Sequence, residues 1–253
     1  LDIRNWKDVR KSIEAHRPEL VLHLAAETDV DRCEKEPDHA YETNAFATEN
    51  VAQACREQGC LMVYISTGNV FDGEKHEAYT EFDRPGSVNV YGRAKYAGEE
   101  IVSTVMERYF IFRAGWMVGG WDIDKKFVYK MVQFCRTETQ LKAVNDKFGS
   151  PTFTVDFAEN LMSVIRTHRY GLYHMTNKGV CSRFEIAQEI VKTMGLKEKV
   201  EVCPVSSLEF PLPAPRPRSE MLRNFKLDLL GLNDMPHWKD SLRTYLLANK
   251  AHW

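Results

Sequence analysis

Side chains with acid–base chemistry lie close together in one stretch of the chain. Ser66 and Thr67 carry hydroxyls, and Tyr91 is followed four positions later by Lys95. Residues four apart share one face of a helix, so Tyr91 and Lys95 are expected to act together. A free phenol titrates near ~10, and an adjacent ammonium favours the phenolate, so we expect Lys95 to move the pKa of Tyr91 toward neutrality. A hydroxyl, a phenol and an ammonium around one ketone are suited to its reduction.

The order of apolar runs and amphipathic stretches indicates the elements that hold these side chains. Strands are predicted at 20–26, 60–66 and 109–113, and helices at 37–58, 91–108 and 124–137. This alternation predicts βαβ crossovers and therefore an α/β fold with a Rossmann-like, doubly wound parallel sheet. Ser66 and Thr67 end the second strand, at the carboxyl edge where such sheets bind ligands.

The chain is predicted to form two regions. Residues 1–150 are interpreted as an NAD(P)-binding domain, and residues 151–253 as a smaller mixed α/β lobe that binds substrate and returns segments to the main domain. Around and within this lobe we expect a turn at 149–152, helices at 154–167, 181–194 and 238–249, and strands at 171–175 and 200–203. The prolines of 211–218 predict an extended loop, because proline lacks an N–H donor and restricts the preceding residue.

A glycine-rich turn is missing from the start of this sequence. A dinucleotide-binding fold ordinarily opens with a strand, a G-x-G-x-x-G turn and a helix, whereas this chain begins at Leu1 without them. Gly119 and Gly120 are adjacent but lack the required spacing. We expect that about 30 residues, one βαβ unit, have been removed before Leu1. The alternative, that this form never had them, stays open.

Composition limits the partners and the compartment. The 253 residues carry a formal net charge of −2, so no basic excess favours nucleic acid or an anionic membrane as a partner. No apolar run approaches the ~18 residues of a membrane span, and the N-terminus lacks the apolar region of a signal peptide. The 6 cysteines show no C-x-x-C spacing, which favours free thiols in a reducing compartment. We therefore expect a soluble cytoplasmic protein.

Several segments together carry a resemblance to a known family. They are Ala25–Asp31 with Asn44, Ser66-Thr67, Val70–Gly73, Val90–Lys95 with Gly98-Glu99, Arg113–Trp116, Asp146–Thr152 and Arg216–Ser219. In these segments the chain resembles the dTDP-4-dehydrorhamnose reductases, which are extended short-chain dehydrogenases/reductases that act on nucleotide sugars. The resemblance implies that NADPH, or NADH in some members, reduces C4 of a dTDP-linked 4-keto-6-deoxy sugar to give dTDP-L-rhamnose. A nucleotide sugar is then the small-molecule partner, and a homodimer is compatible with the family.

The same resemblance implies roles for particular residues. Tyr91 protonates the developing alkoxide, while Lys95 tunes Tyr91 and holds the nicotinamide ribose. Thr67 orients the carbonyl, with Ser66 as its neighbour. Cofactor contacts are implied for Asp2, Ile3, His23, Leu24, Ala25, Ala26 and Asn44, and substrate contacts for Gly68, Asn69, Trp116, Arg216 and Arg218. A guanidinium fork matches phosphate oxygens, so the two arginines are expected to hold the pyrophosphate.

One departure from the family pattern affects the substrate side. Family members commonly have Ser-Thr-Asp-Tyr-Val-Phe where this chain has Ser66-Thr67-Gly68-Asn69-Val70-Phe71. The change removes a carboxylate and a phenol from the implied sugar pocket. The identity of the sugar is therefore open, whereas the acid–base pair is intact.

Structural interpretations compete with the functional ones at several positions. A lone histidine on an apolar strand is more often a core residue, so this interpretation is favoured for His23. Trp116 could belong to the core, Asn44 could be an ordinary polar helix residue, and the arginines could lie in a solvated loop. Carboxylates suit divalent ions such as Mg²⁺, yet solvated loop charge is the favoured interpretation of Glu27, Asp29 and Asp31, and we assign no metal ligand.

Three functions are compatible with the motifs. The leading hypothesis is an NAD(P)H-dependent reductase of a nucleotide-sugar ketone. A nucleotide-sugar epimerase or dehydratase uses the same side chains and keeps its NAD bound. A non-catalytic regulatory subunit that retains the fold is the third alternative, motivated by the missing glycine turn and by Gly68-Asn69.

Overall fold

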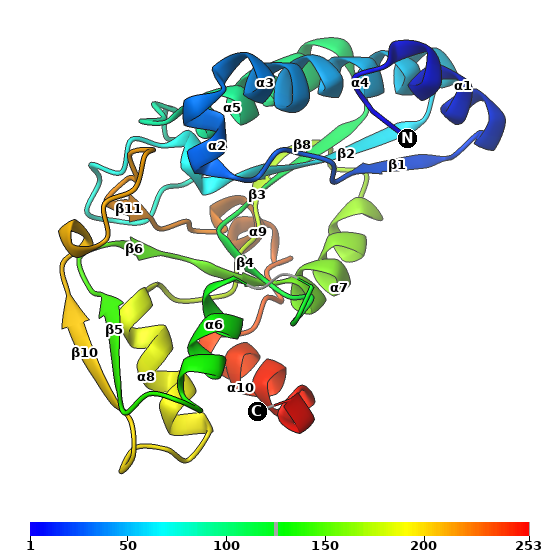
Figure 1. Cartoon of the computed structure of the whole chain (residues 1–253). Coiled ribbons are helices and arrows are strands. Elements are labelled where there is room, and N and C mark those ends of the chain that lie inside the picture. The colour runs from blue at the N-terminus through cyan, green and yellow to red at the C-terminus, as the bar shows by residue number, and fades with distance from the viewer. Residues whose placement is uncertain (124–125, 253) are drawn as a thin grey trace.

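The main sheet has four parallel strands in the order β1-β2-β3-β8 (Figure 1). The computed structural model describes residues 1–123 and 126–252. The strands of this sheet are β1 (Leu20–His23), β2 (Leu61–Thr67), β3 (Tyr109–Ala114) and β8 (Gly171–His174). Helices lie on both faces of the sheet, so the predicted α/β fold with a doubly wound parallel sheet is confirmed.

Successive side chains of β2 enter hydrophobic clusters on opposite faces of the sheet. Met62 and Tyr64 contact a core cluster that contains residues of α1, α4 and α5. Val63 points the other way, into a cluster that contains residues of α7 and α9. Successive side chains of a strand point to opposite faces, and a strand covered on both faces is apolar throughout. The uninterrupted apolar run of the sequence is therefore a central strand.

The first face of the sheet carries the helices of the N-terminal half. They are α1 (Trp6–His16), α2 (Val30–Lys35), α3 (Pro37–Tyr41), α4 (Ala47–Gln58) and α5 (Val90–Val105). The sequence did not predict α1 or α2 as helices. The predicted helix at 37–58 has the right extent, but its middle, η1 (Glu42–Phe46), is π-helical. This segment carries Asn44, whose side chain bonds the main chain of Glu27.

The other face is covered by α7 (Thr154–Ile165) and α9 (Phe225–Leu230). A second region below them, seen at the bottom of Figure 1, contains α6 (Phe127–Phe134), α8 (Arg183–Thr193) and α10 (Trp238–Ala248). Its strands form short sheets: β4 (Trp116–Val118) with β7 (Pro151–Phe153), β5 (Gln140–Val144) with β10 (Glu201–Val205), and β6 (Phe148–Gly149) between β9 (Cys181–Ser182) and β11 (Ser219–Glu220). Short 3-10 helices complete the described elements: η2 (Gly68–Val70), η3 (Ser207–Glu209) and η4 (Lys250–His252).

Several sequence-based boundaries differ from the structure. The helix predicted at 91–108 ends at Val105, and the helix predicted at 181–194 begins at Arg183, after the strand β9. The strand predicted at 20–26 ends at His23. The turn predicted at 149–152 is wrong, because β6 and β7 flank Ser150; Pro151 is tolerated as the first residue of a strand. The helix predicted at 124–137 begins at Phe127 and ends at Phe134, and the first two positions of that prediction lie outside the described residues. The proline-rich loop at 211–218 has no helix or strand, as predicted.

The chain passes between the two regions more than once. Residues of β4, α6 and β5, all before position 150, pack in one cluster with residues of α8 and α10. In return β8, which comes after position 150, completes the main sheet. A boundary at residue 150 therefore does not separate the second region from the main sheet.

All six cysteines are free thiols, and Cys203 alone among them is partly exposed. Among the helices of the described ranges, none combines the length and apolar character that a membrane crossing requires.

A buried ion pair joins α5 to the sheet. The Arg113 guanidinium of β3 donates to the Glu99 carboxylate of α5, with Nη2 to Oε2 at 2.6 Å and Nε to Oε1 at 2.9 Å. Ser66 Oγ of β2 donates to the same carboxylate. The two charged side chains are 2% and 5% exposed, so each depends on the other to compensate for its lost hydration.

Glu99→Ala is expected to lower the free energy of unfolding by ~3–5 kcal/mol, because it leaves the Arg113 charge buried without its partner. The loss is measured as a shift of the urea unfolding midpoint. Glu100→Ala, at the exposed neighbouring position on the same helix, is the matched control and should stay within ~0.5 kcal/mol of wild type. Equal effects of the two substitutions would contradict the structural role of the pair.

Candidate active site

A cavity of about 1290 Å³ lies between the carboxyl edge of the main sheet and the second region. Its volume exceeds the ~300–1,000 Å³ typical of a small-molecule pocket. Residues that line it include Thr67, Tyr91, Lys95, Trp116, Arg183 and Glu220. The catalytic residues expected from the sequence therefore meet in one cavity with an aromatic and two further charged side chains.

Helix α5 begins at the cavity with a well-formed N-cap. Asn89 Oδ1 accepts a hydrogen bond from the Gly92 amide at 2.9 Å, which satisfies one of the free donors of the first turn. Position 92 lies so close to the main-chain carbonyl of Asn69 that a Cβ there would collide with it. This close approach brings Tyr91, next to Gly92, over the end of β2.

The electrostatics of Tyr91 differ from the expectation based on spacing. Burial raises the pKa of Tyr91 to about 12, and its hydrogen bond with Thr67 lowers it. The predicted shift toward neutrality is therefore wrong. Burial also lowers the pKa of Lys95 to about 7, and the Lys95 ammonium lies 4.0 Å from the centroid of the Tyr64 ring. Lys95 is thus a weaker source of positive charge than an ordinary lysine.

The two hydroxyls at the end of β2 have different environments. Ser66 also lines the cavity, but its Oγ donates to the Glu99 carboxylate. Thr67 Oγ1 accepts a hydrogen bond from the Asn69 amide at 3.2 Å and also bonds the Tyr91 phenol. Thr67 is therefore the hydroxyl that contacts Tyr91, whereas the Ser66 hydroxyl is taken by Glu99.

A carboxylate reaches the position of the sequence departure from another part of the chain. Asn69 Nδ2 donates to Glu220 Oε2 at 2.5 Å, and Trp116 Nε1 donates to Glu220 Oε1 at 3.1 Å. Burial raises the pKa of Glu220, while the Trp116 hydrogen bond lowers it. Asn69 Oδ1 in turn accepts from Asn89 Nδ2 at 3.0 Å, which links the carboxylate to the N-cap of α5. A Cβ at position 68 would lie 3.4 Å from Leu222 Cδ1, so Gly68 is not required here by lack of space.

Sequence reasoning missed Glu220 and Arg183. The guanidinium of Arg183, the first residue of α8, lies 3.8 Å from the centroid of the Trp116 ring and 4.9 Å from that of Phe127. Burial lowers the pKa of Arg183 to about 10, so it is protonated at neutral pH. Neither residue belongs to a local motif, because both enter the cavity through tertiary packing.

The two arginines expected at the pyrophosphate lie elsewhere. Arg216 Nη2 donates to Asp31 Oδ1 at 3.0 Å, and its Nη1 donates to the Ala214 carbonyl at 2.9 Å. Arg218 is exposed, and its main-chain carbonyl accepts from the Phe148 amide at 3.0 Å. Neither side chain lines the cavity.

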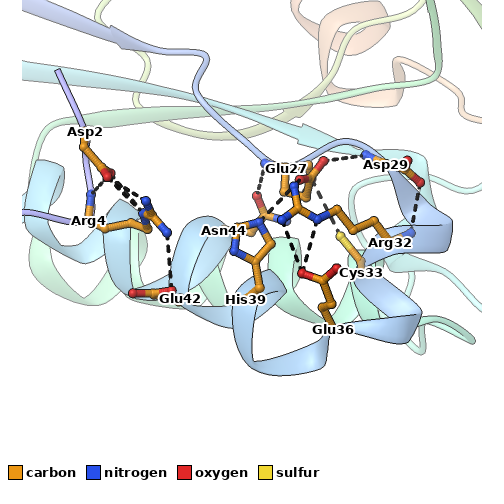
Figure 2. A network of polar contacts seen from close by, with 10 residues as sticks. All are labelled: Asp2, Arg4, Glu27, Asp29, Arg32, Cys33, Glu36, His39, Glu42 and Asn44. Atoms are coloured by element: carbon orange, nitrogen blue, oxygen red, sulfur yellow. Dashed lines mark hydrogen bonds and ion pairs between the residues drawn. The ribbon is translucent and has the colours of Figure 1, made fainter.

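His23 and Asn44, which the sequence predicts at the cofactor, have hydrogen bonds within the protein. His23 is 4% exposed, bonds Thr48 Oγ1 through Nε2 at 3.1 Å and stacks on Tyr64. Burial lowers the pKa of His23 to about 3, so its ring is neutral. Asn44 holds the loop after β1, because its side chain accepts from the Glu27 amide at 2.9 Å and donates to the Glu27 carbonyl at 3.0 Å (Figure 2). These contacts agree with the core interpretation of His23.

The remaining residues expected at the cofactor lie along the same edge. Leu24 and Ala26 line the large cavity, whereas Ala25 is exposed beside them. Asp2 and Ile3 line a separate depression that also includes Ala26. Asp2 pairs with Arg4 at 2.7 Å (Figure 2), and this hydrogen bond lowers the pKa of Asp2 to about 2.

The acidic residues of the loop after β1 have protein partners. Glu27 pairs with Arg32 at 3.0 Å, and Asp29 Oδ1 accepts from the Arg32 amide as the N-cap of α2 (Figure 2). Asp31 is held by Arg216. In the described part of the chain, no group of three or more histidine, cysteine, aspartate or glutamate side chains is arranged to hold a metal ion.

Comparisons with known proteins agree over nearly the whole chain. A solved dTDP-4-dehydrorhamnose reductase from Clostridium acetobutylicum superposes with a TM-score of 0.94 at 39% identity, covering 99% of this chain and 88% of that one. A second, from Bacillus anthracis in complex with NADP, has a TM-score of 0.93 at 39% identity, covering 98% and 87%. The dTDP-4-dehydrorhamnose reductase of Streptomyces griseus is 34% identical over 248 residues, which are 96% of this chain and 81% of that protein.

The family assignment rests on an independent sequence match. The sequence model of the family described as the RmlD substrate binding domain matches residues 1–250. The resemblance seen in the motifs is thereby confirmed. This chain belongs to the RmlD substrate binding domain family.

Proposed function

We propose that this chain reduces the 4-keto group of dTDP-4-dehydrorhamnose with a nicotinamide cofactor and forms dTDP-L-rhamnose. The observation that carries the proposal is the meeting of Thr67, Tyr91 and Lys95 in one cavity at the carboxyl edge of the sheet. The reductases of Clostridium acetobutylicum and Streptomyces griseus, at 39% and 34% identity, support the same reaction.

The cavity suits a nicotinamide cofactor on the side of β1 and β2. Leu22 and Leu24 are 41% and 63% exposed, and both line the cavity together with Ile65. Such apolar surface suits a flat ring, and Lys95 supplies a donor for ribose hydroxyls. A bound NADPH supplies the hydride; NADPH is favoured because the Bacillus anthracis relative was solved with NADP. Use of NADH and formation of a homodimer stay predictions.

The protein side chains handle the proton. Thr67 and Tyr91 hydroxyls both donate to the substrate carbonyl oxygen, which orients it and stabilises the charge that develops as the ketone becomes an alkoxide. Tyr91 then transfers its proton to that oxygen. Lys95, one turn further along α5, stabilises the phenolate that remains, since it takes up a proton more readily once a negative charge lies beside it.

The raised pKa of Tyr91 favours the reductive direction. With a pKa of about 12, the phenol is fully protonated at neutral pH, which is the form that a proton donor requires. Oxidation of an alcohol would instead require the phenolate as a base.

Tyr91→Phe is expected to lower kcat by ~100-fold or more, because the general acid is lost while the shape of the cavity is kept. The measurement is NADPH oxidation, followed by absorbance, with dTDP-4-dehydrorhamnose as substrate. NADPH binding, measured by fluorescence titration, should stay close to that of wild type.

Tyr96→Phe is the matched control, because Tyr96 lies on the same helix but does not line the cavity; its turnover should be close to wild type. Unchanged turnover in Tyr91→Phe would refute the assigned proton donor. Tightly held NAD with no consumption of added NADPH would indicate the epimerase or dehydratase alternative. Absence of any nicotinamide binding by the full-length protein would indicate a regulatory subunit.

Lys95→Met is expected to be more stable than wild type at about pH 6, with a difference that narrows as the pH rises. Lys95 has a pKa of about 7 when folded against an ordinary value of 10.5. Between these values the unfolded chain binds a proton that the folded chain does not, so the stability of wild type rises with pH relative to the variant. Urea unfolding at about pH 6, 8 and 10 measures the difference.

Lys11→Met serves as the control for this titration, because Lys11 is exposed on α1. The pH dependence of Lys95→Met is measured against that of this variant, which also loses one lysine. A constant difference between Lys95→Met and wild type would show that Lys95 titrates as an ordinary lysine.

A further inference from the structure

Arg183 lines the large cavity without a protein partner for its N–H groups. Within the described part of the chain, its guanidinium has no hydrogen bond or ion pair; its contacts are with the faces of Trp116 and Phe127. A guanidinium that lies flat on an aromatic ring keeps the donors along its edge available. Arg183 thus offers a fork of donors to whatever occupies the cavity.

The nearest carboxylate does not take these donors. Glu220 attracts the charge of Arg183, but its two oxygens already accept from Asn69 and Trp116. Trp116 is therefore fixed at its edge by Glu220 and covered on its face by Arg183. The guanidinium is held in a defined place and is ready to accept an anion.

The charge of the cavity also favours an anion. Its lining includes five basic residues and two acidic ones, namely Lys95, Lys126, Lys130, Lys142 and Arg183 against Glu138 and Glu220. The whole chain, by contrast, has a formal net charge of −2. Basic side chains thus outnumber acidic ones in this lining. Lys142 pairs with Glu209 at 3.0 Å, and burial lowers the pKa of Lys95 to about 7, so Arg183 is the lining charge best placed to attract an anionic ligand.

The position of Arg183 relative to the reacting centre defines which anion it can meet. Contacts run from Thr67 through Asn69, Glu220 and Trp116 to Arg183. In a pyranose linked through C1, the diphosphate lies across the ring from C4. When C4 is at Thr67, the diphosphate therefore points away from β2, into the region of the cavity where α8 begins.

We propose that Arg183 binds the diphosphate of the nucleotide-sugar substrate, in the role that the sequence assigned to Arg216 and Arg218. This assignment rests on the proposed function, which places the sugar C4 at Thr67. The guanidinium fork matches two phosphate oxygens, and the Trp116 ring contacts it at 3.8 Å. Arg183 is accordingly a substrate-binding residue and takes no part in proton transfer.

Arg183→Met tests the assignment through the difference between dTDP and thymidine. Isothermal titration calorimetry with wild type and variant gives both dissociation constants. We expect dTDP to bind about tenfold more weakly or worse to the variant, because charge-assisted hydrogen bonds are lost, with little change for thymidine. Arg183→Lys, which keeps the charge without the fork, should show an intermediate loss.

Arg223→Met is the matched control. The Arg223 guanidinium also lies over an aromatic ring, Phe225, at 4.9 Å, but it pairs with Asp228 and does not line the cavity. It should bind both ligands like wild type. In kinetics, Arg183→Met should raise the KM for dTDP-4-dehydrorhamnose and leave kcat nearly unchanged.

Two results would overturn the proposal: equal weakening of dTDP and thymidine in Arg183→Met, or unchanged dTDP binding by that variant. A wild-type chain that binds dTDP no more tightly than thymidine would overturn it as well. Failure of the proposed reaction is seen separately, as absence of NADPH oxidation by wild type. The comparison of dTDP with thymidine still tests Arg183 in that case, since it requires no turnover.

Discussion

The ion pair between Glu99 and Arg113 fixes the helix that carries the reactive phenol to the sheet that carries the reactive hydroxyl. Glu99 follows Lys95 by one turn and Tyr91 by two, so all three lie on the same face of α5. Arg113 and Ser66 hold Glu99 from two neighbouring strands. A shift of the helix by one turn would leave the charges of Glu99 and Arg113 buried without a partner. The distance between phenol and hydroxyl is thereby set by a contact outside the cavity.

Burial, more than neighbouring charge, determines the protonation states around this helix. It raises the pKa of Tyr91 and of Glu220 and lowers that of Lys95. All three shifts favour the neutral form, as expected where water is excluded. A phenol that stays protonated suits a ketone reductase. Its proton is needed only when negative charge develops on the carbonyl oxygen of the substrate. Burial of Tyr91 by the fold therefore keeps its phenol protonated.

The sequence predicted the local features well and the long-range ones poorly. The central strand was expected at 60–66 and is found at Leu61–Thr67, because an apolar run bounded by polar residues is a local pattern. The Tyr91 and Lys95 pair followed from helical spacing alone. The pKa of Tyr91 could not be predicted, since depth of burial depends on packing from the whole fold. Nor could Glu220 or Arg183 be found, because no local pattern places them beside Trp116.

The bond between Asn69 and Glu220 spans 151 positions of the chain, which has a consequence for biosynthesis. Proteins emerge from the ribosome N-terminus first, and early segments begin to fold before later ones exist. Tyr91 and Lys95 of α5 are synthesised long before β11. Until β11 is synthesised, Asn69 has no Glu220 carboxylate to bind. Binding of substrate therefore requires β11, which is synthesised after α5.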